Sequence, residues 1–92
     1  MITVRIPTIL RPLTGGAAEV SVSDALTLTD VLDRLEVDHP GLRTRVLDDD
    51  GKLRRFVNVY VDDDDVRFAS GLQTPTPDGT TVSIIPAVAG GS

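Results

Sequence analysis

Apolar and polar residues alternate with a period of two in several short segments of the chain. Residues 2–6 read Ile-Thr-Val-Arg-Ile, which predicts a strand that buries one face and is ended by Pro7. Residues 18–22 repeat the pattern after a loop that contains Pro12 and Gly15-Gly16, so the two segments predict a hairpin with a long loop. In the last strand, residues 80–85, the alternation directs Ile84 inward and Ile85 to the opposite face.

The spacing changes to three and four residues after position 27. Thr27 followed by Asp30 is typical of a helix start with a capping box. One apolar stripe then marks the buried side of this helix: Leu28, Val31, Leu32 and Leu35. His39-Pro40-Gly41 ends the helix, and the apolar residues between 42 and 47 indicate a short second helical segment.

The strongest strand signal lies in residues 55–61, where β-branched and aromatic side chains dominate. Alternation places Phe56 and Tyr60 on the face opposite to the valines. The acidic run 62–65 predicts a hairpin turn, and 66–68 would form the returning strand. Adjacent carboxylates are poorly placed to surround a metal ion, so we interpret this run as a turn.

The order of elements predicts an α+β domain, with one main helix on one face of a mixed four- or five-stranded sheet. The other sheet face would then carry no helix. Strand phase places Arg5, Phe56, Tyr60 and Ile85 on that face, beside polar residues. An apolar patch with a polar rim favours a partner-binding site, although scattered surface hydrophobes are also normal.

Charge and composition narrow the function classes. The chain has nine basic and fourteen acidic side chains and a net charge of −5, which argues against nucleic acid as a partner. It contains no cysteine and a single histidine, His39, so disulfides and thiolate nucleophiles are excluded and a histidine-based catalytic site is disfavoured. We find no apolar run of membrane length and no leader, and we expect a cytoplasmic protein.

The last residues differ from the rest of the chain. Pro86 cannot donate to a strand ladder and is expected to stop the last strand. Ala87, Val88 and Ala89 are small, and Gly90-Gly91 could lie extended in a tunnel too narrow for other residues. We therefore divide the chain into a domain of residues 1–86 and a flexible tail of residues 87–92. The alternative is a frayed terminus without function.

Two segments carry a family resemblance. The ending from Asp78-Gly79 through Pro86 to Gly90-Gly91, together with the strand and turn of residues 56–62, resembles the MoaD/ThiS family of sulfur carriers. This resemblance implies the ubiquitin-like β-grasp fold. Within the family, residues 6–12, 14–16 and 55–58 are most similar to the actinobacterial carriers that serve cysteine synthesis.

The resemblance also implies a mechanism without catalytic side chains or a bound cofactor. An E1-like adenylyltransferase/sulfurtransferase would adenylate the Gly91 carboxylate, using its own ATP and Mg²⁺. A sulfur donor would convert the acyl-adenylate into a thiocarboxylate. The acceptor would be a pyridoxal-phosphate (PLP)-dependent cysteine synthase or another sulfur acceptor enzyme, and in the cysteine branch a metalloprotease would release the product from the tail.

Ser92 departs from the pattern, because a mature carrier of this kind ends at the second glycine. We expect a precursor from which a protease removes Ser92, although an added or substituted residue is the alternative. Other functions remain open: a carrier for molybdopterin, thiamin or another metabolite, a modifier conjugated through Gly91 to lysines of other proteins, or a binding module with an inert tail. Self-conjugation would be limited to Lys52, the single lysine of the chain.

Overall fold

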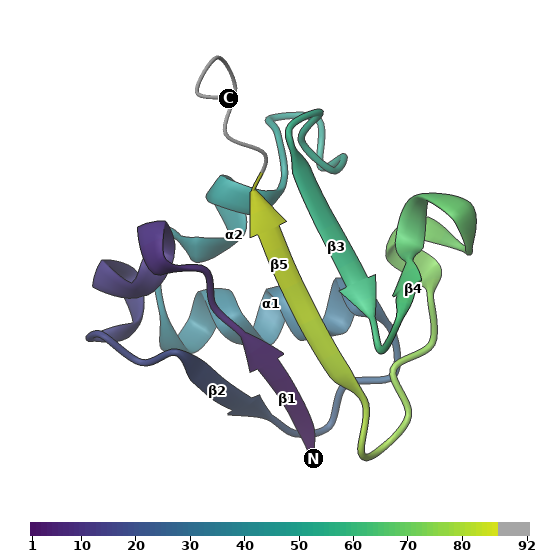
Figure 1. Ribbon diagram of the computed structural model, residues 1–92, viewed down its shortest axis with the longest axis horizontal. Helices are drawn as coiled ribbons and strands as arrows, with labels where there is room; N and C mark the ends of the chain where they lie inside the picture. The colour runs from purple at the N-terminus through teal and green to yellow at the C-terminus, as the bar shows by residue number, and fades with distance from the viewer. Residues whose placement is uncertain (87–92) are drawn as a thin grey trace.

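A single twisted sheet and one main helix form the two layers of the protein. The computed structural model describes residues 1–86, and Figure 1 shows the sheet in front of the helices. Its elements in chain order are β1 (Ile2–Arg5), the 3₁₀ segment η1 (Thr8–Thr14), β2 (Glu19–Val22), α1 (Leu28–Asp38), α2 (Leu42–Val46), β3 (Val57–Val61), β4 (Asp64–Asp65), η2 (Val66–Phe68), η3 (Gly71–Gln73) and β5 (Thr81–Pro86). The predicted α+β class is confirmed.

The sheet has five strands in the order β2-β1-β5-β3-β4. The predicted hairpin is confirmed, since β1 pairs antiparallel with β2. β1 and β5 run parallel in the centre, and β5 pairs antiparallel with β3. The sheet is therefore mixed, as the sequence indicates, and the neighbouring parallel strands β1 and β5 come from opposite ends of the described chain.

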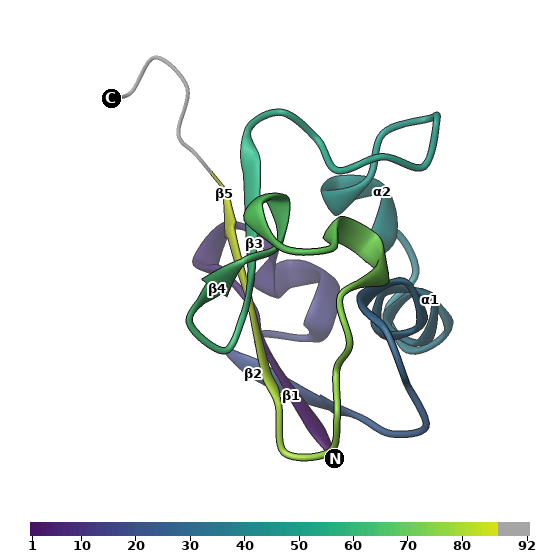
Figure 2. The same ribbon diagram turned by 90° about the vertical axis from the view of Figure 1, so that its right-hand side faces the viewer.

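Helix α1 covers one face of this sheet, as the edge-on view in Figure 2 shows. The Asp30 amide donates to the Thr27 hydroxyl at 3.4 Å, and the Thr27 amide donates to the Asp30 carboxylate at 3.3 Å, which is the predicted capping box. The whole predicted stripe is at most 1% exposed: Leu28, Val31, Leu32 and Leu35. Valines from the three central strands meet this stripe and complete the core: Val4, Val59 and Val82.

The segment between β1 and β2 differs from the predicted irregular loop, because residues 8–14 form 3₁₀ turns. The side chain of Leu10 is buried beneath this segment, whereas that of Ile9 is 73% exposed. The segment ends at Gly15, whose φ of 66° lies in the left-handed region that glycine adopts easily. The Thr14 hydroxyl donates to the Ala17 carbonyl at 2.9 Å and helps to close the turn.

The predicted strand at residues 66–68 is wrong. β4 contains only Asp64 and Asp65, and the chain then enters η2. The cause is local: the Asp65 carboxylate accepts a hydrogen bond from the Arg67 amide at 2.9 Å, a side-chain contact that competes with a strand ladder. In residues 66–68, only Val66 is buried, and the residues after it are exposed. The apolar–polar alternation of this segment therefore does not mark a strand.

Two strand ends also differ from expectation. β3 begins at Val57, so Phe56 lies in the turn before the strand and is 55% exposed. Pro86 is the last residue of β5 and stands opposite Val57, so the strand includes the proline instead of stopping before it. Residues 87–92, to which the sequence assigns the tail, lie outside the described residues.

Candidate functional site

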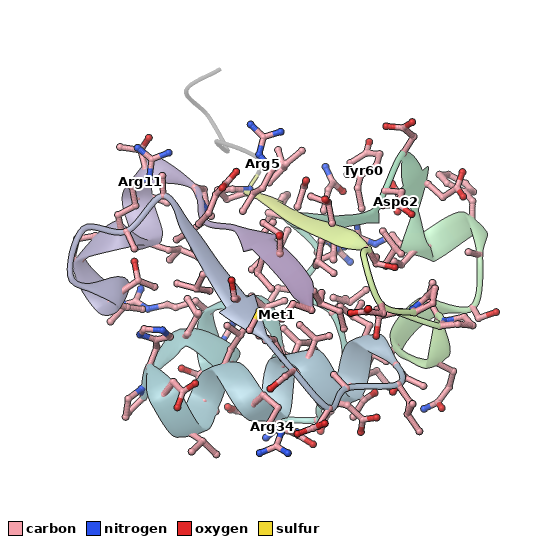
Figure 3. The ribbon with its side chains drawn as sticks, turned by 90° about the horizontal axis from the view of Figure 1, so that it is seen from below. Met1, Arg5, Arg11, Arg34, Tyr60 and Asp62 are labelled. Atoms are coloured by element: carbon pink, nitrogen blue, oxygen red, sulfur yellow. The ribbon has the colours of Figure 1, made fainter. Side chains whose placement is uncertain are left out.

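The helix-free side of the sheet carries a row of aligned side chains, which we call the open face. Tyr60 stands opposite Ser83, and Ser83 stands opposite Arg5. Side chains at paired positions lie on the same face of a sheet. Figure 3 shows Arg5 and Tyr60 on one side of the sheet and Arg34, from α1, on the other. The structure thus brings together residues from β1, β5 and β3.

Ile85 supplies the apolar part of the open face. It pairs with Asn58 and is 48% exposed, whereas its neighbour Ile84 is 3% exposed. The predicted strand phase of β5 is therefore confirmed, with Ile84 in the core and Ile85 outside. Phe56 does not share the register, because it precedes β3, but it remains an exposed apolar side chain near the start of that strand.

A groove lies on the open face beside the end of β5, and we call it the tail-side groove. Its volume is about 570 Å³. β1, η1 and β5 provide most of its lining, which includes Arg5, Pro7, Arg11, Ser83, Ile85 and Pro86. Because Pro86 is the last described residue and lines this groove, the groove adjoins the point where residues 87–92 begin.

Arg11 is a groove residue that the sequence analysis did not identify. Its Nε donates to the Ile6 carbonyl at 3.1 Å, which fixes the side chain against the end of β1. The sequence signal is its place in segment 6–12, which carries the family resemblance, between Leu10 and Pro12. A charged residue in a region expected to be a loop gives no indication of which surface it joins, so only the folded arrangement reveals it.

Arg67 orders the opposite border of the open face. Its guanidinium donates to the Asn58 side-chain oxygen at 2.5 Å and to the Arg54 carbonyl at 2.6 Å. These contacts hold the turn that carries Phe56 against the start of β3. This residue was also missed, because the interaction joins η2 to the loop before β3.

The acidic run after β3 forms a turn, as predicted. Asp62 has a positive φ of 54°, and its carboxylate accepts from the Thr81 amide at 3.0 Å. Within residues 1–86, no group of three or more histidine or acidic side chains could hold a metal ion. The contacts of Asp62 thus join the β3 turn to the start of β5.

The residues assigned to the reactive end, Gly91 and the preceding Ala87, Val88, Ala89 and Gly90, lie outside the described residues. What the structure does describe is their anchor, the central strand β5. β5 is hydrogen-bonded on both sides, to β1 and to β3. No helix in the described part of the chain has the length and apolarity needed to cross a membrane.

Known proteins match the chain over nearly its full length. The ThiS family profile matches residues 4–91. Sulfur carrier protein CysO of Mycobacterium tuberculosis is 54% identical over 92 residues, with 98% of each chain covered. Its crystal structure aligns with a TM-score of 0.90 at 52% identity, covering 96% of this chain and all of that one.

Two further relatives bear on function. A chain in the crystal structure of the Amycolatopsis orientalis BexX/CysO complex aligns with a TM-score of 0.91 at 47% identity, and the alignment covers 98% of this chain and 99% of that one. Small archaeal modifier protein 3 of Haloferax volcanii is 40% identical over 70 residues, covering 76% of this chain and 75% of its own length. The matches confirm the ubiquitin-like β-grasp fold. The chain belongs to the ThiS family and is a sulfur carrier protein, a cosubstrate of partner enzymes and not itself an enzyme.

Proposed function

We propose that this protein carries sulfur for cysteine biosynthesis as a thiocarboxylate on Gly91. The observation that carries the proposal is the 54% identity to CysO over 98% of both chains, supported by a family match that extends to residue 91. The chain itself contains no cysteine, so a side-chain thiol cannot hold the sulfur. A C-terminal thiocarboxylate requires only the backbone carboxyl group of Gly91.

Loading of the sulfur takes two steps. The Gly91 carboxylate oxygen attacks the α-phosphate of ATP, and pyrophosphate leaves. Sulfide then attacks the acyl-adenylate carbon and forms a carbon–sulfur bond, the carbon–oxygen bond to AMP breaks, AMP leaves with its electron pair, and the thiocarboxylate remains. We assign both steps to an E1-like adenylyltransferase/sulfurtransferase that binds ATP and Mg²⁺ itself. The carrier contributes the reacting carboxyl group and a surface that orients it.

Delivery of the sulfur requires a second partner. In this proposal the thiocarboxylate attacks an aminoacrylate that a PLP-dependent cysteine synthase forms from its own substrate. A metalloprotease then hydrolyses the bond that links the new cysteine to the tail. A surface used by successive enzymes should be exposed and free of helices, and the open face with Ile85 meets this requirement.

Ser92 must leave before Gly91 can react. We propose that a protease, acting on the precursor, exposes the Gly91 carboxylate. Protein ending at Ser92 and protein ending at Gly91 are incubated with the activating enzyme, ATP, Mg²⁺ and sulfide, and their intact masses are measured. Only the Gly91-terminal form should gain the mass of one oxygen-to-sulfur exchange. Loading of the Ser92-terminal form would contradict the precursor proposal.

A companion variant for this experiment is Gly91→Ala in the Gly91-terminal protein. An added methyl group crowds the reacting carbonyl in a narrow tunnel, so loading should slow at least about tenfold, a barrier increase of roughly 1.4 kcal/mol. The β-grasp domain is unchanged in this variant, and its unfolding curve should match that of the parent. Unchanged loading would argue against a close fit around Gly91.

A second candidate function is conjugation to other proteins. The observation that favours it is the 40% identity to small archaeal modifier protein 3 over 70 residues. In that case the Gly91 acyl-adenylate would react with lysine amines, and denaturing gels would show carrier adducts on target proteins. Conjugation to a second copy of the carrier could use only Lys52, which is exposed. Thiocarboxylate without adducts supports the carrier role, and adducts without cysteine formation support the modifier role.

A further inference from the structure

The tail-side groove combines two arginines, one glutamate (Glu19) and apolar walls on a protein of net charge −5. Arg5 projects from the end of β1, and Arg11 projects from η1. Figure 3 shows both on the helix-free side of the sheet, far from Arg34 on α1. The groove therefore carries more basic than acidic side chains, although the molecule as a whole is acidic, and it adjoins the end of β5.

The charges of both arginines are available to a partner. The Arg5 guanidinium is 4.0 Å from the Glu19 carboxylate, and these side chains are 66% and 61% exposed, so water screens the pair and the interaction is weak. The Nε of Arg11 donates a hydrogen bond to the Ile6 carbonyl. None of the ion pairs among residues 1–86 involves Arg11. Its terminal nitrogens can therefore donate to a further acceptor.

The apolar part of the groove restricts what that acceptor can be. Ile85 and Pro86 from β5 and Pro7 after β1 line the same space as the two arginines. A free phosphate would use the guanidinium groups and leave this apolar surface exposed. A peptide segment with a carboxylate side chain beside an apolar one would satisfy both, because guanidinium binds carboxylate in a bidentate manner.

We propose that the tail-side groove seats an acidic, partly apolar segment of the activating enzyme, located beside the entrance that receives the tail. The inference rests on the proposed function, because it names the surface by which the Gly91-bearing carrier is recognised. Two features support this occupant: opposite charge, and continuity of the groove with Pro86, from which the tail starts. Arg5 and Arg11 then act as positioning residues that speed the encounter and fix the angle of entry.

The test compares three single charge reversals in Gly91-terminal protein: Arg5→Glu, Arg11→Glu and Arg34→Glu. Each changes the net charge by the same amount, and Arg34 is exposed on α1 on the other side of the sheet. Adenylation is followed as ATP–pyrophosphate exchange at low salt. The two groove variants should raise KM for the carrier about tenfold with little change in kcat, and the difference should shrink at high salt. Arg34→Glu should leave KM near that of the parent.

Arg11→Lys separates charge from the contact with Ile6, since it keeps the charge and loses Nε. A KM for Arg11→Lys near the parent value supports electrostatic recognition. Unfolding curves verify that every variant in the comparison is folded. Equal KM values for the groove variants and Arg34→Glu would overturn the proposal. A parent protein that forms a dimer, which the groove variants dissociate, would also overturn it, because a second copy of the chain would then occupy the groove. If the parent is not adenylated at all, it is the proposed function that fails.

Discussion

The exposure of Ile85 supports our proposal that this side chain acts in partner recognition more than in stability. It neighbours Ile84 in β5, yet it is 48% exposed while Ile84 is 3% exposed. Fully burying an isoleucine side chain stabilises a fold by roughly 1.5–3 kcal/mol. The buried Ile84 therefore contributes most of this free energy to stability, and the half-exposed Ile85 contributes much less. An apolar side chain held on a central strand without cover is suited to contact a partner.

We predict that Ile85→Asp weakens docking to the activating enzyme and leaves the domain folded. The new carboxylate would remain hydrated, and the cost of an unfavourable strand residue is at most about 1 kcal/mol. KM for the carrier should rise at least about tenfold if Ile85 is a central contact. The measurement is adenylation kinetics together with circular dichroism of the variant.

The control for this change is Val37→Asp, which places the same substitution at a 75% exposed position on α1. KM should then remain near the parent value. If Ile85→Asp unfolds the domain, the outward orientation of Ile85 in β5 is contradicted. Equal KM values for the two variants would mean that Ile85 is not part of the docking surface.

At the residue scale, the sequence predicts on which sheet face a strand side chain lies, because strand periodicity determines it. It does not predict the side chains whose role depends on contacts between distant segments. The exposure of Ile85 and the shared face of Arg5 and Tyr60 follow from alternation in strands whose valines face the core. Arg11 and Arg67 could not be assigned in this way, because each contributes through a side-chain contact to a backbone carbonyl in another segment. Such contacts depend on how the loops are placed in space.

Among the elements, α1 connects sequence and stability most directly. Its capping box satisfies amides that the first helical turn leaves without partners. We predict that Thr27→Ala lowers the free energy of unfolding by about 1 kcal/mol, the typical effect of losing a threonine N-cap. Urea denaturation measures this change. Thr8→Ala, at an exposed position, should shift the midpoint little, and an equal shift would argue against the cap.

The element predictions succeeded where a hydrophobic period continues over several residues, as in α1 and β5. They failed at short connections. The three residues of η2 have the alternation of a strand, but the Asp65 side chain binds the backbone two residues later and turns the chain. The same limit applies to η1, where Pro12 and the glycines indicate a loop without revealing the 3₁₀ turns that place Arg11.

At the scale of the whole molecule, the proposed recognition surface and the proposed reacting residue belong to different segments: the open face lies within residues 1–86, and Gly91 belongs to residues 87–92. Residues from Ile2 to Ile84 form a continuous hydrophobic core that joins the sheet to α1 and α2. We propose on this basis that residues 1–86 fold without residues 87–92. The open face would then bind a partner whether or not a tail is present, while chemistry would require Gly91.

This separation can be measured with protein ending at Pro86. We predict that the shortened protein keeps the unfolding midpoint of the parent and inhibits adenylation of the Gly91-terminal carrier competitively. If the open face and the groove supply most of the binding energy, the inhibition constant should lie within about tenfold of KM, a difference of roughly 1.4 kcal/mol. The same shortened protein with Arg34→Glu should inhibit equally well, and with Ile85→Asp it should inhibit poorly. Absence of inhibition by the folded domain would mean that the enzyme recognises the tail alone, because a docking surface on the sheet must bind without it.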